Sequence, residues 1–302
     1  MECVLCPRQC RADRTRGRGY CGEREEVSVA RASLHMWEEP CISGKNGSGT
    51  VFFSGCPLRC VYCQNRKIAL GGRGRTLTTA QLSALFLLLQ DKGAENINLV
   101  TPTQFTPQIA EALNMSKSAG LTVPIVYNTS GYEQLAALRM MDGLVDIYLP
   151  DLKYYSKEPA ERYSGAPDYF EYASRAIAEM VRQAGAPVFE SRSDGEKMMK
   201  RGVIVRHMVM PGHVRDSRQV IKYLSDTYGK DIYISIMNQY TPPSDLEGYP
   251  EISRRVTRRE YEKVVDYAIS LGVENAFVQE GETAEESFIP DFEDEKYLKE
   301  VL

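Results

Sequence analysis

The sequence predicts an α/β protein whose parallel sheet curves into a barrel or partial barrel. Strand-like and helical patterns alternate from residue 50 to residue 279, which is typical of successive βαβ units. Right-handed crossovers between such units curve a sheet toward a barrel. The chain has 302 residues, which leaves room for six or seven strands but not for eight full units.

Each element follows from a local pattern. The first strand is expected at 50–54, because TVFFS is rich in β-branched and aromatic residues. Helix 79–91 follows, since its leucines and phenylalanine recur at helical spacing. Helix 107–118 begins with a proline, a favoured first helical residue. By the same patterns, further strands are expected at 96–100, 123–127, 145–149, 202–210, 231–237 and 276–279, and further helices at 132–141, 169–184, 214–228 and 258–271.

Two segments precede this array and one follows it. Residues 1–26 are rich in cysteine, arginine and glycine and are too short for a hydrophobic core, so a metal or the main domain must order them. Residues 27–49 are interpreted as a connecting segment and 50–280 as the barrel domain. Residues 281–302 form an acidic tail that is expected to pack loosely.

Composition excludes several classes of protein. Charged residues are 26% of the chain and the formal net charge is −4, which argues against a general nucleic-acid binder. The first ten residues contain charges and cysteines instead of an apolar run, and no stretch has the ~18 apolar residues of a membrane helix. We therefore expect a cytoplasmic protein without a membrane partner.

The eight cysteines all lie in about the first fifth of the chain. Disulfides are one explanation, but a cytosolic chain of this length needs no such cross-links and its compartment does not maintain them. Two closely spaced groups favour metal ligation instead.

The strongest motif is Cys56-x3-Cys60-x2-Cys63, in the loop after the first strand. Iron–sulfur clusters normally have four cysteine ligands. Three thiolates would leave one iron open, as a catalytic metal keeps a free coordination position. A three-cysteine zinc site is the alternative that the spacing allows.

This motif, with Tyr62 before the last cysteine, resembles the radical S-adenosylmethionine (SAM) superfamily. The stretch SGCPLRCVYCQN is similar to the activating-enzyme branch, in particular the pyruvate formate-lyase activating enzyme-like group with an extra N-terminal cysteine motif. The resemblance runs through most of residues 43–240. It implies a partial (β/α)6-type radical SAM barrel, preceded here by a small cysteine-rich metal-binding segment.

The resemblance also implies the chemistry. Cys56, Cys60 and Cys63 would hold a [4Fe–4S] cluster, and SAM would chelate the open iron and be cleaved reductively to a 5′-deoxyadenosyl radical that abstracts hydrogen. An oxidoreductase of this kind works anaerobically, because an open iron is sensitive to oxygen. It needs a one-electron donor such as flavodoxin or ferredoxin, and a glycyl radical enzyme is the substrate protein that the activating-enzyme branch implies.

Polar residues follow the first three strands. Tyr62 would pack by the adenine, with ordinary core packing as the alternative. Where the family usually reads GGE, this chain has Thr101 and Thr103, whose hydroxyls can accept the hydrogen bond of the SAM amino group. Asn128 and Ser130 lie in a segment similar to the family's TNG turn and can reach the ribose. A plain turn explains them equally well.

Charged residues follow the next two strands. Asp151 and Lys153 resemble the DxK motif of the activating enzymes, and strand alternation places both on one face. A pair of surface charges is the alternative. Arg206 lies in a segment that resembles R-x-x-V-x-P-G, whose arginine meets the SAM carboxylate, a contact that favours the guanidinium fork. His207 alternates to the other face and is expected to be structural.

The second cysteine group, Cys3-x2-Cys6-x3-Cys10-x10-Cys21, has four thiols. That number suits structural zinc or a second iron–sulfur cluster, and the spacing leaves both open. The nearby arginines favour a solvated loop, with docking of a partner as the alternative. Cys41 is interpreted as a buried thiol, with ligation at the N-terminal site as the other reading.

Three functions remain in competition. The first is activation of a glycyl radical enzyme, supported by the DxK and VMPG resemblances. The second is radical SAM modification of a small molecule or peptide, supported by the missing GGE and the added cysteines. The third is a non-catalytic metal-binding interaction protein, against which the charged residues at successive strand ends count.

Overall fold

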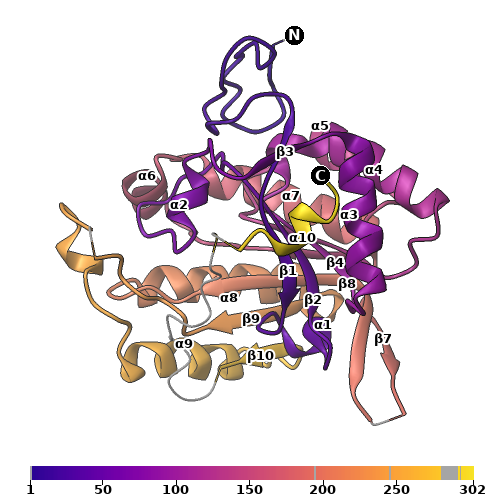
Figure 1. The fold of residues 1–302 in the computed structure, drawn as a ribbon. Helices are drawn as coiled ribbons and strands as arrows, with labels where there is room; N and C mark the ends of the chain where they lie inside the picture. The colour runs from indigo at the N-terminus through magenta and orange to yellow at the C-terminus, as the bar shows by residue number, and fades with distance from the viewer. Residues whose placement is uncertain (1, 194, 245, 280–291, 293) are drawn as a thin grey trace.

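The computed structural model describes residues 2–193, 195–244, 246–279, 292 and 294–302 (Figure 1). Its centre is a ten-stranded sheet in which seven neighbouring strands run parallel. The predicted α/β fold with a mostly parallel sheet is therefore confirmed. In spatial order the parallel strands are β2 (Ser48–Phe53), β4 (Ile97–Val100), β5 (Ile125–Thr129), β6 (Ile147–Pro150), β8 (Lys197–Met208), β9 (Tyr233–Met237) and β10 (Ala276–Val278).

Helices connect these strands and cover one face of the sheet. Two of them begin with a capping box, Thr78 with Gln81 and Thr257 with Glu260, which satisfies backbone N–H groups that would otherwise lack partners. The longer helices are α3 (Thr79–Asp91), α4 (Thr106–Ser118), α5 (Leu135–Arg139), α6 (Lys157–Ser164), α7 (Tyr169–Ala184), α8 (Val214–Tyr228) and α9 (Arg258–Ser270). None of the helices in the described ranges is long and apolar enough to span a membrane.

Strand alternation divides the buried side chains between two cores. Tyr127 and Tyr148 belong to the large core under the helices. Val126, Ile147 and Leu149 belong to a smaller cluster on the other face. Successive side chains of a strand point to opposite faces. Polar residues that alternate in step with Val126, Ile147 and Leu149, nearer the carboxyl ends of the same strands, therefore lie on the inner face of the curved sheet.

The segment 27–49 is more than a connection, which corrects the prediction. It forms strand β1 (Val27–His35), which pairs antiparallel with β2, and the short helix α1 (Pro40–Ser43). The strand β3 (Arg75–Leu77) then pairs with β1. The apolar run of β1 is interrupted by Ser28, Arg31 and Ser33. The strand is regular because it pairs with β2.

Three further elements were not predicted. The strand β7 (Val188–Ser191) forms a hairpin with the start of β8, a four-residue helix, α2 (Arg66–Ala69), follows the cysteine motif, and helix α6 lies between β6 and α7. Three short 3-10 turns complete the described elements, at Thr103–Phe105, Gly229–Asp231 and Pro250–Ile252.

The end of the tail packs firmly, contrary to the expectation of a loose tail. Helix α10 (Lys296–Lys299) buries Leu298 completely in the large core and lies against β1 and α3. Arg75 of β3 donates two hydrogen bonds to Glu295, at 2.8 and 2.9 Å. Residues 281–291 and 293 of the predicted tail lie outside the described residues.

Candidate functional site

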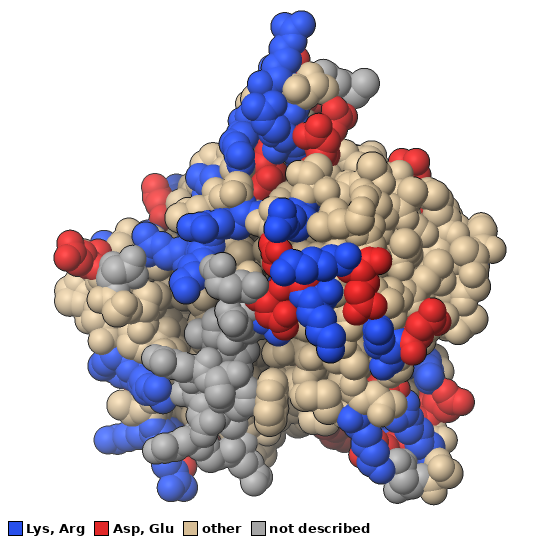
Figure 2. Space-filling model, in the orientation of Figure 1, with Lys and Arg blue, Asp and Glu red and all other residues tan. Residues whose placement is uncertain are grey.

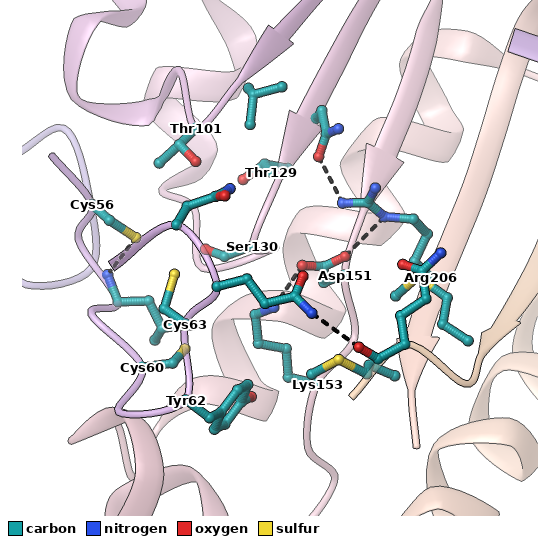
Figure 3. Close-up of a pocket in the computed structure, with 18 of the residues that line it drawn as sticks. Cys56, Cys60, Tyr62, Cys63, Thr101, Thr129, Ser130, Asp151, Lys153 and Arg206 are labelled. Carbon is teal, nitrogen blue, oxygen red and sulfur yellow. Dashed lines mark hydrogen bonds and ion pairs between the residues drawn. The ribbon is translucent and has the colours of Figure 1, made fainter. Parts of the chain in front are cut away.

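A cavity of about 250 Å³ lies on the inner face of the sheet, at the carboxyl ends of the parallel strands. Ligands in parallel α/β folds bind at this end of the sheet. Figure 3 shows the cysteines on one side of the cavity and Arg206 on the other, with Asp151 and Lys153 between them. The predicted residues that line the cavity are Cys56, Cys60, Tyr62, Cys63, Thr101, Asn128, Ser130, Asp151, Lys153 and Arg206.

The cysteine loop, residues 55–65, connects β2 to α2 and carries four of these residues, three of them cysteines. Gly55 opens it with φ +80°, a left-handed conformation that favours glycine. Cys63 N–H then donates to the Cys60 carbonyl at 3.2 Å, which closes a tight turn. The thiol sulfur of Cys60 accepts a hydrogen bond from Ser164 Oγ at 3.0 Å. The three sulfurs are thus presented to the cavity by a loop that backbone contacts hold in place.

The surroundings of these thiols disfavour bare thiolates. Burial, followed by the neighbouring Cys60, raises the pKa of Cys56 to about 11 and, with Cys56 contributing as well, the pKa of Cys63 to about 12. A thiolate is the form that binds metal. A positively charged iron centre bound here would stabilise the thiolate form of these cysteines.

Asp151, Lys153 and Arg206 form one buried ionic network. Lys153 Nζ lies 2.6 Å from Asp151 Oδ2, and Arg206 Nε lies 3.0 Å from Asp151 Oδ1. Burial alone would raise the pKa of Asp151, but Arg206 and Lys153 outweigh it and leave the pKa below its ordinary value. Burial likewise lowers the pKa of Lys153, yet Asp151 and then Cys60 raise it above the usual value. The predicted DxK and arginine positions therefore meet as charged groups around one cavity.

Glu38 is a fourth charged group of this network, and the sequence prediction missed it. Its Oε1 accepts hydrogen bonds from the amides of Asn98 and Asn128, at 2.9 and 3.3 Å. Its Oε2 lies 3.4 Å from Arg206 Nη1, and its side chain is 9% exposed. Glu38 follows β1, so only the pairing of β1 with β2 brings it to the cavity. No motif in WEEP signals this role.

Tyr62 both lines the cavity and packs in the core. One side lines the cavity, while the ring packs against Tyr240 with centroids 5.8 Å apart. Its hydroxyl is 2.6 Å from that of Tyr154, which lies 2.9 Å from Ser164 Oγ. Because Ser164 also donates to Cys60, the tyrosines help to fix the cysteine loop.

The two threonines after β4 separate in the structure. Thr101 lines the cavity and has φ +58°, a strained conformation for a β-branched residue and one that often marks functional sites. Thr103 does not face the cavity, which corrects its predicted cofactor role. The chain turns into a 3-10 helix there, and the buried Thr103 hydroxyl donates instead to Glu133 at 2.6 Å.

The remaining predicted residues fall in three places. His207 is buried and bonded to the Leu152 carbonyl at 2.7 Å, so its structural role is confirmed. Cys41 is buried in the smaller core beside Ile42, as a plain thiol. Each of the eight cysteines is free of disulfides. The N-terminal cysteines pack on the outer side of the cysteine loop and do not line the cavity.

Further cavity residues carried no sequence signal. Gln64 Nε2 donates to the Gln239 carbonyl at 2.9 Å, which ties the cysteine loop to the end of β9. Trp37, just beyond the end of β1, also lines the cavity and was not predicted.

The donor set fits a [4Fe–4S] cluster with SAM. Three cysteines face the cavity, and the charged network opposite them presents both signs, as the zwitterionic methionine part of SAM requires. Among the described residues, no three histidine, cysteine or carboxylate side chains converge on a point that would hold a single metal ion.

The chain is similar to one curated protein and to several solved structures. A curated relative, the uncharacterized protein MJ0674 of Methanocaldococcus jannaschii, is 27% identical over 275 residues, which are 88% of this chain and 74% of the relative. Among solved structures, Streptococcus suis SuiB bound to S-adenosylmethionine matches with a TM-score of 0.48 and 14% identity, over 80% of this chain and 52% of SuiB. A radical SAM methyltransferase from Sphaerobacter thermophilus matches with a TM-score of 0.48 and 15% identity, over 78% and 67%.

The family follows from a match between the sequence and the model of a protein family. This chain spans about half the length of SuiB, so that likeness concerns only part of the other protein. The model of the radical SAM superfamily, in contrast, matches residues 50–224, from β2 to α8 and more than half of the chain. These residues carry the cysteine loop and every charged group of the cavity except Glu38. The chain therefore belongs to the radical SAM superfamily.

Proposed function

We propose that this enzyme cleaves SAM reductively and uses the 5′-deoxyadenosyl radical to abstract hydrogen from a glycyl radical enzyme. One observation carries the first part: three free cysteines and a charged network of both signs face each other across one cavity. Bound at the cysteines, a [4Fe–4S] cluster supplies the electron that breaks the sulfonium carbon–sulfur bond. The protein binds, orients and shields the reactants.

The charged groups have separate tasks toward the methionine part of SAM. Arg206 is held at Nε by Asp151 and at Nη2 by Asn128, at 3.0 and 2.7 Å. Its Nη1 makes the longer contact with Glu38, at 3.4 Å. We assign Nη1 and Lys153 to the SAM carboxylate. The carboxylate of Glu38 then accepts the SAM ammonium, the task that the family's GGE glutamate would perform.

The surface beside the cavity supports a polypeptide substrate. Trp37 lines the cavity and is 60% exposed, and its neighbour Met36 is 44% exposed. Large apolar side chains beside a cavity mouth are typical of surfaces that bind another protein. Together with the DxK and VMPG segments, this favours a glycine loop of a partner protein as the hydrogen donor.

A small molecule or free peptide is the second candidate substrate. The observation that favours it is the divergence after β4, where Thr101 replaces the family's glycines and Thr103 faces away from the cavity. A changed cofactor wall leaves a differently shaped space for the substrate.

The first experiment is anaerobic reconstitution with iron and sulfide, followed by reduction in the presence of SAM. We expect 5′-deoxyadenosine, and we expect it to disappear in the Cys56→Ala, Cys60→Ala and Cys63→Ala variants. Cys41→Ala is the matched control, because Cys41 is a buried thiol of the other cluster of side chains. A fully loaded, reduced protein that never yields 5′-deoxyadenosine, with or without candidate substrates, would refute SAM cleavage.

The substrate is tested separately by electron paramagnetic resonance. With pyruvate formate-lyase as the probe, the proposal expects a glycyl radical that requires SAM and Lys153. A Trp37→Ala variant should still make 5′-deoxyadenosine without a protein substrate but should lose radical formation on the partner. Cleavage of SAM with no radical on any glycyl radical enzyme tried would favour the small-molecule candidate.

A further inference from the structure

The four N-terminal cysteines gather in one place outside the cavity. A Cβ atom at Gly19 would stand 3.4 Å from the sulfur of Cys21 and 3.5 Å from that of Cys10, so both sulfurs flank one point. The same Cβ position would stand 3.6 Å from Cδ of Arg14, whose Nη1 lies 3.9 Å from the sulfur of Cys3. The sulfurs of Cys3, Cys10 and Cys21 therefore lie around Gly19 and Arg14, with Cys6 and Cys21 buried and Cys10 exposed.

The surrounding backbone is folded tightly although it has little apolar core. Cys3 N–H donates to the Ala12 carbonyl at 3.1 Å, and Arg11 N–H donates back to the Cys3 carbonyl at 3.0 Å. Gln9 N–H donates to the Cys6 carbonyl at 3.0 Å. A segment this short needs a metal centre or a larger neighbour to stay ordered. Four thiols are the usual number of ligands of an iron–sulfur cluster, whereas no three of the described side chains converge on a point that would hold a single metal ion.

Two arginines fasten this segment to the barrel. Arg8 donates to the carbonyl of Pro57 in the cysteine loop at 2.8 Å and to that of Ser164 at the end of α6 at 2.7 Å. Arg14 donates to the Gln104 carbonyl at 2.5 Å. The position of the N-terminal thiols relative to the cysteine loop is thereby held by side-chain hydrogen bonds.

A single hydrogen bond joins the two cysteine groups. The carbonyl oxygen of Cys21 accepts the N–H of Cys56 at 3.3 Å. The contact is close enough that a Cβ atom at Gly55 would stand 2.6 Å from the same carbonyl oxygen. Cys21 and Cys56, one cysteine of each group, are thus connected directly through their backbones by this hydrogen bond. Structural zinc does not require such a link, but electron transfer between two clusters benefits from it.

From this geometry we infer that Cys3, Cys6, Cys10 and Cys21 hold an iron–sulfur cluster that passes electrons to the site of Cys56, Cys60 and Cys63. The inference rests on the proposed function, which consumes one electron per SAM cleaved. A reduced one-electron donor of the flavodoxin or ferredoxin class loses one electron to the N-terminal cluster. That electron leaves through the Cys21–Cys56 contact, and no bond or proton changes hands.

The surface around the N-terminal segment suits an acidic donor. Figure 2 shows Lys and Arg side chains grouped on the part of the molecule that projects at the top, where Figure 1 places the N-terminus. The side chains of Arg11 and Arg16 are 70% and 89% exposed. Their nearest acidic contacts, Glu2 and Asp13, lie at 3.9 and 3.7 Å. Positive charge beside the exposed Cys10 would steer a negatively charged donor to the electron's point of entry.

The site is tested without the catalytic cysteines. A Cys56→Ala/Cys60→Ala/Cys63→Ala protein is reconstituted anaerobically with iron, sulfide and an equal amount of zinc, and its metals are measured. We expect about four irons per chain, as in a cysteine-bound [4Fe–4S] cluster, and a paramagnetic signal after reduction. One zinc per chain, or no metal, overturns the inference. Neither result depends on SAM cleavage, so a failure of this inference can be told apart from a failure of the proposed function.

The relay is tested by reduction rates in the otherwise native, reconstituted protein. Arg11→Glu/Arg16→Glu should slow reduction by flavodoxin about tenfold at low ionic strength, measured by the loss of visible cluster absorbance. Reduction by dithionite, a small anion that needs no docking surface, should change far less. As a second variant, Cys10→Ser should lower the yield of the N-terminal cluster and slow reduction by flavodoxin. Unchanged flavodoxin rates in both variants would exclude the N-terminal segment as the route of the electron.

Discussion

Glu133 offers a prediction whose magnitude follows from the structure. Its carboxylate is buried and accepts hydrogen bonds from the hydroxyls of Thr103 and Thr129, so it ties the end of β4 to the end of β5 below the cavity. Burial outweighs these hydrogen bonds and raises the pKa of Glu133 to about 7, from an ordinary 4.5. The folded protein therefore holds a proton at pH values where the unfolded chain has lost it.

The consequence is a stability that falls as the pH rises. Below the pKa that Glu133 has in the unfolded chain, its carboxyl is protonated in both the folded and the unfolded state and does not change the free energy of unfolding. Between that pKa and about 7 the unfolded chain alone ionises, and folding becomes less favourable. A shift of this size corresponds to about 3 kcal/mol, most of which develops between about pH 5 and pH 8.

The perturbation is Glu133→Gln, which keeps an acceptor oxygen but has no proton to lose. We expect the free energy of unfolding of the variant, minus that of the native chain, to grow by about 2–3 kcal/mol from about pH 5 to pH 8. The measurement is urea unfolding of the apo-protein under reducing conditions, followed by circular dichroism.

Glu179→Gln is the matched control. Hydrogen bonding to Arg182 lowers the pKa of Glu179 to about 2, so both of its states are ionised over most of this range and the difference should stay nearly flat. If the Glu133 difference is equally flat, the carboxylate is ionised in the folded protein at neutral pH and the reasoning from burial is wrong.

Three further predictions follow from single contacts. Glu38→Gln should weaken SAM binding to the reconstituted protein about tenfold, because a charged hydrogen bond to the ammonium is lost; unchanged affinity in equilibrium dialysis would contradict the assignment. Leu298→Ala should lower the free energy of unfolding by about 2–5 kcal/mol, since this tail residue is fully buried, and urea unfolding would show otherwise if the tail were loose. Gly55→Ala should lower iron incorporation, because its Cβ would meet the Cys21 carbonyl oxygen at 2.6 Å. Gly143→Ala is its control, as its φ is +76° with no atom within 4 Å of the added Cβ; equal iron content in the two variants would show that the contact is unimportant.

Local patterns in the sequence determined much of the fold and one half of the site. Helices α3, α7 and α8 have the predicted bounds, because apolar spacing and end signals are properties of the helix itself. The cavity residues Asp151 and Arg206 were also predictable. Parallel strands end at one edge, and alternation decides which face each side chain takes.

Other features depended on contacts between distant parts of the chain. Thr103 was misplaced because a 3-10 turn after β4 redirects its side chain toward Glu133. Glu38 was missed because its segment reaches the cavity only when β1 pairs with β2. In both cases the nearest neighbours in the sequence carry no signal of the partner.

The sequence by itself determined the cysteines that line the cavity, the parallel α/β order and the charged residues at the strand ends, since each is encoded within a few consecutive residues. Only the tertiary structure decided that Glu38 completes the charged network and that Cys21 touches Cys56. Pairing of separate segments depends on which buried surfaces and backbone groups satisfy each other across the whole chain. That choice is made by the fold, and spacing along the sequence does not record it.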